Sequence, residues 1–70
     1  MPYEYNIIRT ELGWIISRKK EMGRLMILQY LNWYWVWQPN KWSARVFYDK
    51  SKAESSMIAM KIKDKKKSDE

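Results

Sequence analysis

Short apolar segments alternate with turn signals along the chain, and the densest apolar stretch is Trp33-Tyr34-Trp35-Val36-Trp37. Aromatic and β-branched residues favour a strand here. Alternation along that strand would send the three tryptophans to one face and the other two side chains to the opposite face. Both faces would then be apolar. A chain of 70 residues can cover one face with a helix, but it has little left to cover the second.

The N-terminal part has the pattern of a β-hairpin. Residues 3–10 have strand character, and a second apolar run begins at Trp14. A type I turn over Glu11 and Leu12, with Gly13 in the left-handed conformation, would join the two strands.

The next apolar segment, residues 24–31, is compatible with two structures, since a continuous apolar run fits a buried strand or a helix. Its Leu, Met, Gln and Arg residues favour a helix. The short turn offered by Gly23 and the strand expected after the segment favour β structure, and we prefer the strand. Asn32 predicts a bend before the aromatic stretch.

A second hairpin is predicted around Gln38-Pro39-Asn40-Lys41, which has proline and asparagine where a turn favours them. Residues 33–37 and 42–47 would pair across this turn. The pattern as a whole predicts an α+β fold: a small antiparallel β-meander of four or five strands packed by one C-terminal helix.

The helix is predicted from a capping box, in which Ser51 caps the first turn and Glu54 reaches back to it. It should span residues 52–62, with Ala53, Met57 and Met60 forming the stripe that lies on the sheet. Ile58 and Ile62 lie off this stripe. We therefore expect one domain over residues 1–62 and a polar, lysine-rich mobile tail over residues 63–70.

Composition limits the chemistry. Cysteine and histidine are absent, which removes disulfides, thiolate metal sites and the commonest general base. The acids nearest to predicted elements, Glu21, Asp49 and Glu54, show no spacing that suggests a shared site. We expect no catalytic residues, no metal site and no cofactor, and hence a protein that is not an enzyme.

The net charge is +6, from 14 basic and 8 acidic residues, and such a charge draws a protein to anionic partners. The first residues lack the features of a signal peptide. The longest uncharged run, residues 25–40, is short for a membrane span, which needs about 20 apolar residues. We expect a cytoplasmic protein without a membrane span.

The segment from Trp42 to Glu54, Trp-Ser-Ala-Arg-Val-Phe-Tyr-Asp-Lys-Ser-Lys-Ala-Glu, resembles a pattern in small accessory proteins of bacteriophages and prophages. In those proteins a tryptophan-containing strand leads into an Ala-Arg-hydrophobic-Phe element, a polar turn and a helix that opens with Ala-Glu. The resemblance covers part of the C-terminal half. It implies a phage-type protein acting in the host cytoplasm by binding a host component, as inhibitors such as anti-CRISPRs do, and it brings no active site.

Aromatic rings beside basic side chains suggest a nucleic-acid-binding surface, on which bases stack while Lys and Arg contact phosphates. Single strands are favoured because their bases can reach the rings. Three alternating tryptophans more often build a core than a platform, so we assign Trp33, Trp35 and Trp37 to the core. The candidate contacts are Tyr34, Trp42, Arg45, Lys41, Arg18, Lys19, Lys20 and Arg24.

Other uses of the same side chains stay open. Trp, Tyr and Arg are the residues enriched in protein hot spots, so the alternative function is a stoichiometric inhibitor of an acidic host protein or of a host nucleic-acid-processing or defence complex. The exposed face could instead form a homodimer. A lipid-headgroup binder is less favoured, because no clean amphipathic helix is present.

Overall fold

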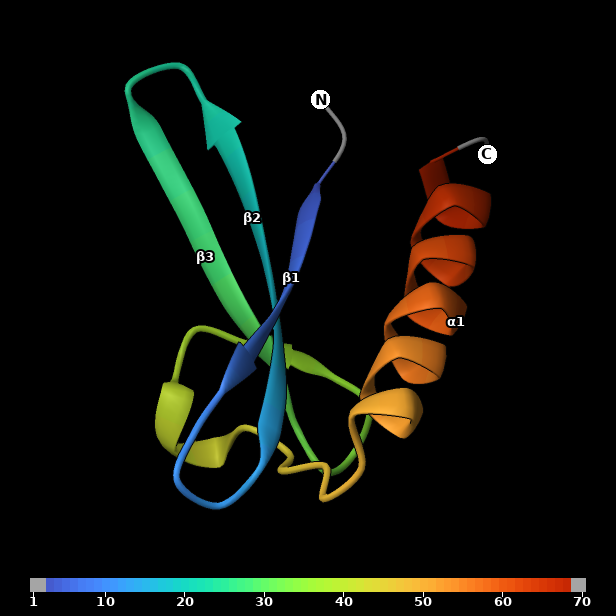
Figure 1. Ribbon diagram of the computed structural model, residues 1–70. Coiled ribbons are helices and arrows are strands. Elements are labelled where there is room, and N and C mark those ends of the chain that lie inside the picture. Colours follow the sequence, from blue (N-terminus) through green and yellow to red (C-terminus); the bar gives the residue numbers. More distant parts are fainter. Residues whose placement is uncertain (1–2, 69–70) are drawn as a thin grey trace.

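Four antiparallel strands and one long helix form the protein in the computed structural model, which describes residues 3–68 (Figure 1). The strands follow chain order in the sheet, and α1 packs against one face of β1 and β2. The predicted α+β fold is confirmed, as is the strand assignment for most of residues 24–31. The elements are β1 (Glu4–Arg9), β2 (Trp14–Met22), β3 (Leu25–Leu31), β4 (Trp37–Gln38), the 3-10 helix η1 (Lys41–Ser43) and α1 (Lys50–Ser68).

Two tight turns connect the first three strands. In the first, the backbones of Thr10 and Gly13 exchange two hydrogen bonds, and the Thr10 hydroxyl accepts from the amides of Leu12 and Gly13. The predicted hairpin is confirmed, but Gly13 has a φ of 152° rather than a left-handed helical value. Glycine is required there because an added Cβ would lie 2.3 Å from the Phe47 carbonyl oxygen. Gly23, with a φ of 63°, occupies the second turn.

The core lies between the sheet and α1. Its buried members come from β2, β3, the segment that precedes α1 and α1 itself, and Trp37, Met57 and other half-buried side chains pack around them. The predicted helix stripe is confirmed, because Ala53 and Met60 are buried and Met57 packs against the core, whereas Ile58 and Ile62 are exposed. The buried residues of this cluster are Ile16, Leu31, Phe47, Ala53 and Met60.

The opposite face of the sheet has a cover of its own. Ile15 and Ser17 alternate with Ile16 along β2 and are buried, but they lie outside the main core. Ala44 is also buried, and η1 contacts β3. Figure 1 shows η1, in yellow-green, on the side of the sheet away from α1. The irregular segment around η1 therefore shields part of the second face.

The predicted aromatic strand is wrong. Residues 33–36 form a turn, and only Trp37 enters a strand. The side-chain oxygen of Asn32 accepts hydrogen bonds from the amides of Tyr34 and Val36, which bends the backbone before it can extend. Trp35 has a left-handed φ of 62°. The core assignment accordingly fails for Trp33 and Trp35, which are exposed, and holds for Trp37, which packs against the core.

The predicted pairing of residues 33–37 with 42–47 is also wrong. Asn40 caps η1 by accepting a hydrogen bond from the Trp42 amide at 2.9 Å, so the chain coils where a return strand was expected. Beyond η1 it pairs at single positions, Ala44 with Asn32 and Phe47 with Trp14.

The helix begins earlier and continues further than predicted. The Asp49 side chain accepts from the Ser51 amide at 2.9 Å, and its carbonyl accepts from Lys52 and Ala53. Asp49 is therefore the cap, and the predicted Ser51 capping box is wrong. Residues 63–68 continue α1 where the sequence predicted a tail, while 69–70 lie outside the described residues. None of the helices in the described part of the chain is long and apolar enough to cross a membrane.

Candidate binding surface of aromatic and basic residues

A loop of exposed rings projects between β3 and β4. We call residues 33–36 the aromatic loop. Tyr34 is 85% exposed, and Trp33 and Trp35 are 52% and 41% exposed. Asn32 holds the loop through three backbone amides, since its side chain accepts from Tyr34 and Val36 and its carbonyl accepts from Trp35. A left-handed φ at a bulky residue such as Trp35 costs about 1–2 kcal/mol, so the loop displays its rings in a strained backbone.

Arg45 lies against the aromatic loop. Its guanidinium carbon is 5.2 Å from the ring centroid of Trp33, 4.7 Å from that of Trp35 and 4.9 Å from that of Phe47. These are cation–π distances. The Arg45 Nε is buried and has no hydrogen-bond partner among the described residues. The Arg45 amide donates to the Leu31 carbonyl at 2.8 Å, which holds its backbone at the end of β3, and the ring contacts place its guanidinium beside the loop.

Trp42 and Lys41 belong to η1. Trp42 is 94% exposed, and Lys41 is exposed beside it. Both η1 and the aromatic loop lie at the end of the sheet away from the β2–β3 turn (Figure 1). The structure therefore places Tyr34, Lys41, Trp42 and Arg45 at one end of the molecule, as candidate contacts that flank the sheet.

Arg18 is engaged in the interior contact between the sheet and α1. Its side chain is 12% exposed, and its Nη1 lies 2.8 Å from the Asp64 carboxylate. Its Nε donates to the Gln29 side chain at 2.8 Å. The guanidinium also lies 3.9 Å from the ring centroid of Tyr3 and 4.5 Å from that of Trp37. These contacts give Arg18 a role in fastening α1 to the sheet.

The remaining basic candidates lie along the arm formed by β2 and β3. Lys19 pairs with Glu4 at 3.5 Å, the Lys20 ammonium lies 5.2 Å from the Tyr3 ring centroid, and Arg24 is exposed in the turn. Because β3 rises about 3.3 Å per residue, Arg24 lies about 20 Å from the end of β3 that leads into the aromatic loop. The structure thus separates Arg24 from the Arg45 end, while Lys19 and Lys20, opposite Leu28 and Ile27, lie between the two.

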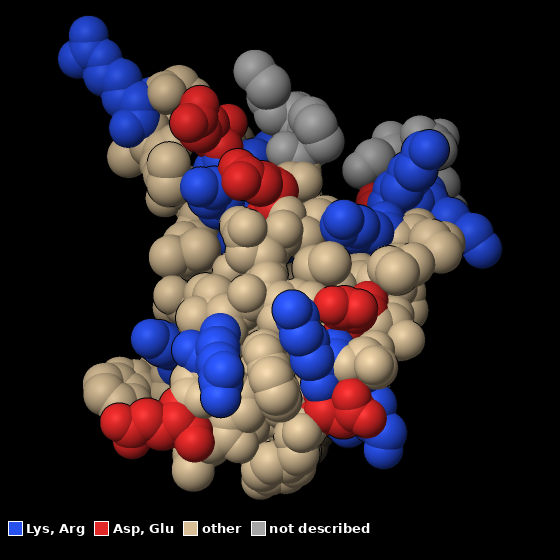
Figure 2. Space-filling view, viewed as in Figure 1, with Lys and Arg blue, Asp and Glu red and all other residues tan. Residues whose placement is uncertain are grey.

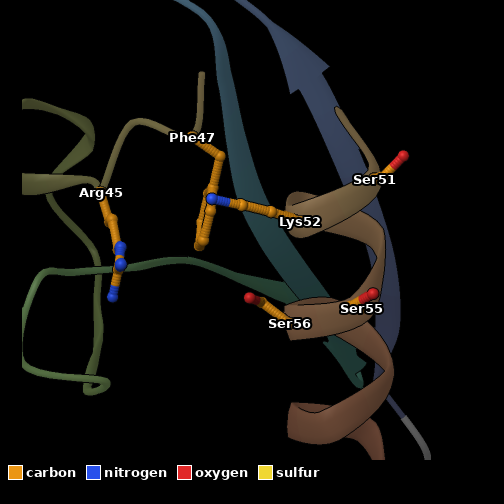
Figure 3. A pocket seen from close by; sticks show the side chains of 6 residues that line it. All are labelled: Arg45, Phe47, Ser51, Lys52, Ser55 and Ser56. Carbon is orange, nitrogen blue, oxygen red and sulfur yellow. The ribbon is translucent and has the colours of Figure 1, made fainter. Parts of the chain in front are cut away.

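A pocket of about 310 Å³ opens between Arg45 and the first two turns of α1 (Figure 3). Figure 3 shows the Ser56 hydroxyl and the Lys52 side chain pointing toward the space beside Phe47. Lys52, Ser55 and Ser56 were not among the site residues expected from the sequence, and Ser51 was expected only as a helix cap. The signal was their i, i+4 spacing, which places Lys52 and Ser56 on one helix face. The lining residues are Arg45, Phe47, Ser51, Lys52, Ser55 and Ser56.

A second pocket, of about 300 Å³, lies further along the helix. Trp35 contributes to it, as does Lys63, and the Arg18–Asp64 ion pair forms part of its wall. The full lining is Arg18, Trp35, Val36, Trp37, Met60, Lys63 and Asp64.

The surface charge is mixed on the face shown in Figure 2, where blue and red groups alternate over the tan surface. No group of three or more His, Cys, Asp or Glu side chains in the described part of the chain could hold a metal ion.

Burial, together with the hydrogen bond that its hydroxyl donates to Asp64, raises the pKa of Tyr5 well above its usual value. The site therefore offers rings, cations and hydroxyls, which suit binding.

A comparison of the chain with protein-family models, with curated proteins and with solved structures finds no match. The geometry of these residues is therefore the basis for any functional conclusion.

Proposed function

We propose that this protein binds single-stranded nucleic acid through the aromatic loop and Trp42, with Arg45 and Lys41 contacting phosphates. The main support for this proposal is that the Tyr34 and Trp42 side chains are 85% and 94% exposed. Both residues belong to segments at the end of the sheet away from the β2–β3 turn (Figure 1), and large exposed apolar side chains there are candidates for a contact surface. Rings that stand free of the core can stack on bases, each worth about 1–3 kcal/mol.

Charge supports nucleic acid as the partner. The chain carries a net charge of +6, and two cations, Arg45 and Lys52, line the pocket beside the aromatic loop. Cations attract the phosphate backbone whatever the base sequence. A single strand suits the surface better than a duplex, because unpaired bases present their faces to aromatic side chains.

Fluorescence anisotropy with labelled single-stranded DNA and RNA tests this proposal. We expect micromolar or tighter binding that weakens as salt rises from about 50 to 200 mM. The variant Tyr34→Ala should bind about 5- to 150-fold more weakly, the loss expected for one stacked base. Leu25→Ala is the matched control, because Leu25 is 73% exposed but lies on the β2–β3 arm. Absence of binding at low salt contradicts the proposal.

A second candidate function is the inhibition of a protein complex, favoured by exposed apolar side chains on the β2–β3 arm, where Leu25, Met26 and Leu28 are accessible. It fits the resemblance to phage accessory proteins. Affinity capture from a nuclease-treated bacterial lysate tests it. The expected result is one stoichiometric protein that the wild type retains and that a Leu25→Asp variant loses, and retention by both proteins contradicts it.

A further inference from the structure

The pocket between Arg45 and α1 has the composition of an anion site. Two cationic side chains, Phe47 and three serines line it, and no carboxylate is among the lining residues. Of the serines, Ser56 points its hydroxyl into the space, whereas the hydroxyls of Ser51 and Ser55 point away from it (Figure 3). Its volume of about 310 Å³ is at the lower end of the range for small-ligand sites. The Arg45, Lys52 and Ser56 side chains are hydrogen-bond donors, and a phosphate oxygen accepts from donors.

Arg45 is held in place before any ligand arrives. Its guanidinium is packed near three rings, and its buried Nε has no hydrogen-bond partner in the described residues. A preorganised guanidinium loses less side-chain entropy on binding than a free one. The first-turn amides of Ser51, Lys52 and Ala53 already donate to Asp49, so the pocket must bind through its side chains.

The second pocket continues the first along the same face of α1. Lys52 and Ser56 line one pocket, Met60 and Lys63 line the other, and these four residues follow the spacing of one helix stripe. At a helix rise of 1.5 Å per residue, the α1 residues that line the two pockets are centred about 12 Å apart along the helix. Arg45 in the first pocket lies 4.7 Å from the ring centroid of Trp35 in the second. The two pockets are therefore neighbours with a cation and a ring at their junction.

We infer that the Arg45–Lys52 pocket binds a backbone phosphate of the single strand, and that the strand continues along α1 toward Trp35 and Lys63. This inference rests on the proposed function and assigns its phosphate subsite. The nucleotide that follows the bound phosphate stacks on Trp35, while Lys63 lies beside the next part of the backbone. Ser56 supplies a neutral donor to the phosphate in the first pocket.

The test compares Lys52→Ala with Lys65→Ala in anisotropy titrations of a labelled single-stranded oligonucleotide over a range of salt concentrations. Both lysines are exposed on α1, and both changes remove one positive charge, but Lys65 lies off the stripe. Alanine favours helix, so both variants should keep the fold, as circular dichroism can check. Loss of one phosphate contact should make the slope of log affinity against log salt less negative by about 0.7, which is about fivefold in affinity at 0.1 M salt relative to 1 M.

A Lys52→Ala protein with this altered slope, beside an unaltered Lys65→Ala protein, supports the subsite. Equal slopes for the two variants and a wild-type affinity for Ser56→Ala overturn the subsite while leaving oligonucleotide binding in place. A wild-type protein that binds no oligonucleotide overturns both the proposed function and the subsite.

Discussion

The guanidinium of Arg18 lies 2.8 Å from the carboxylate of Asp64, with the two side chains 12% and 15% exposed, and this ion pair joins β2 to the last turns of α1. The Tyr5 hydroxyl donates to the same carboxylate. The part of the helix beyond the apolar stripe is thus attached to the sheet by polar contacts, which sequence reasoning did not foresee.

Replacement of Asp64 by alanine should destabilise the fold. It leaves a largely buried guanidinium without its ion-pair partner, and we expect a loss of about 1–3 kcal/mol in the free energy of unfolding, between the values for exposed and buried pairs. Urea denaturation measures the loss, and amide exchange should become faster in residues 62–68. Glu4→Ala is the control, since it breaks the exposed 3.5 Å pair with Lys19, which should contribute less than about 1 kcal/mol. Equal losses in the two variants would contradict the structural role of Asp64.

Stability should fall at alkaline pH because of Tyr5. Burial first, and then the hydrogen bond to Asp64, raise the pKa of Tyr5 in the folded protein above its usual value of 10.0. Below pH 10 the Tyr5 hydroxyl is protonated in both the folded and the unfolded protein, and its full contribution to the free energy of unfolding is present. As pH rises above 10, the unfolded chain loses the proton while the folded protein keeps it, so the free energy of unfolding decreases.

Tyr5→Phe lacks this titration. The difference in unfolding free energy between wild type and Tyr5→Phe should be constant below about pH 9 and shrink above pH 10. Chemical denaturation at a series of pH values measures it. A difference that stays constant up to pH 11 would show that the Tyr5 pKa is not raised in the folded state.

Gly13→Ala should be more harmful than Gly23→Ala. A Cβ at Gly13 would lie 2.3 Å from the Phe47 carbonyl oxygen, where the backbone cannot easily yield, whereas a Cβ at Gly23 meets nothing within 4 Å. The Gly23 change still strains a φ of 63° and should cost about 1 kcal/mol. We expect more than 2 kcal/mol for Gly13→Ala, from backbone displacement in addition to strain. Thermal denaturation of both variants tests the order, and the reverse order would contradict the close approach of Phe47.

The sequence predicted the elements that depend on repeating patterns. Apolar periodicity identified the Ala53 stripe, and Gly13 and Gly23 identified the turns that join β1 to β2 and β2 to β3. The errors came from single polar side chains. The side-chain and backbone oxygens of Asn32 accept hydrogen bonds from three loop amides. These local hydrogen bonds compete with strand pairing and override the strand propensity of the aromatic residues that follow.

The candidate site, like the fold, was predicted only in part from the sequence. Tyr34 and Trp42 were selected as exposed contacts on a hairpin of residues 33–37 and 42–47; both are exposed although that hairpin does not form. The Arg45 pocket could not be predicted, because it depends on α1 beginning at Lys50 and passing close to Phe47. The tertiary contacts of Arg18 were equally hidden, since they join β2 to a segment that looked like a solvated tail.

The most direct test of the account is a comparison of wild type and Trp42→Ala in binding a labelled single strand and the duplex of the same sequence, at about 50 mM salt, where phosphate contacts are strong. Trp42 is 94% exposed, so its removal should leave stability within about 0.5 kcal/mol. We expect the wild type to bind the single strand more tightly than the duplex, and Trp42→Ala to lose about 5- to 150-fold in single-strand affinity. Equal affinity for strand and duplex, or single-strand binding that Trp42→Ala does not change, would contradict it.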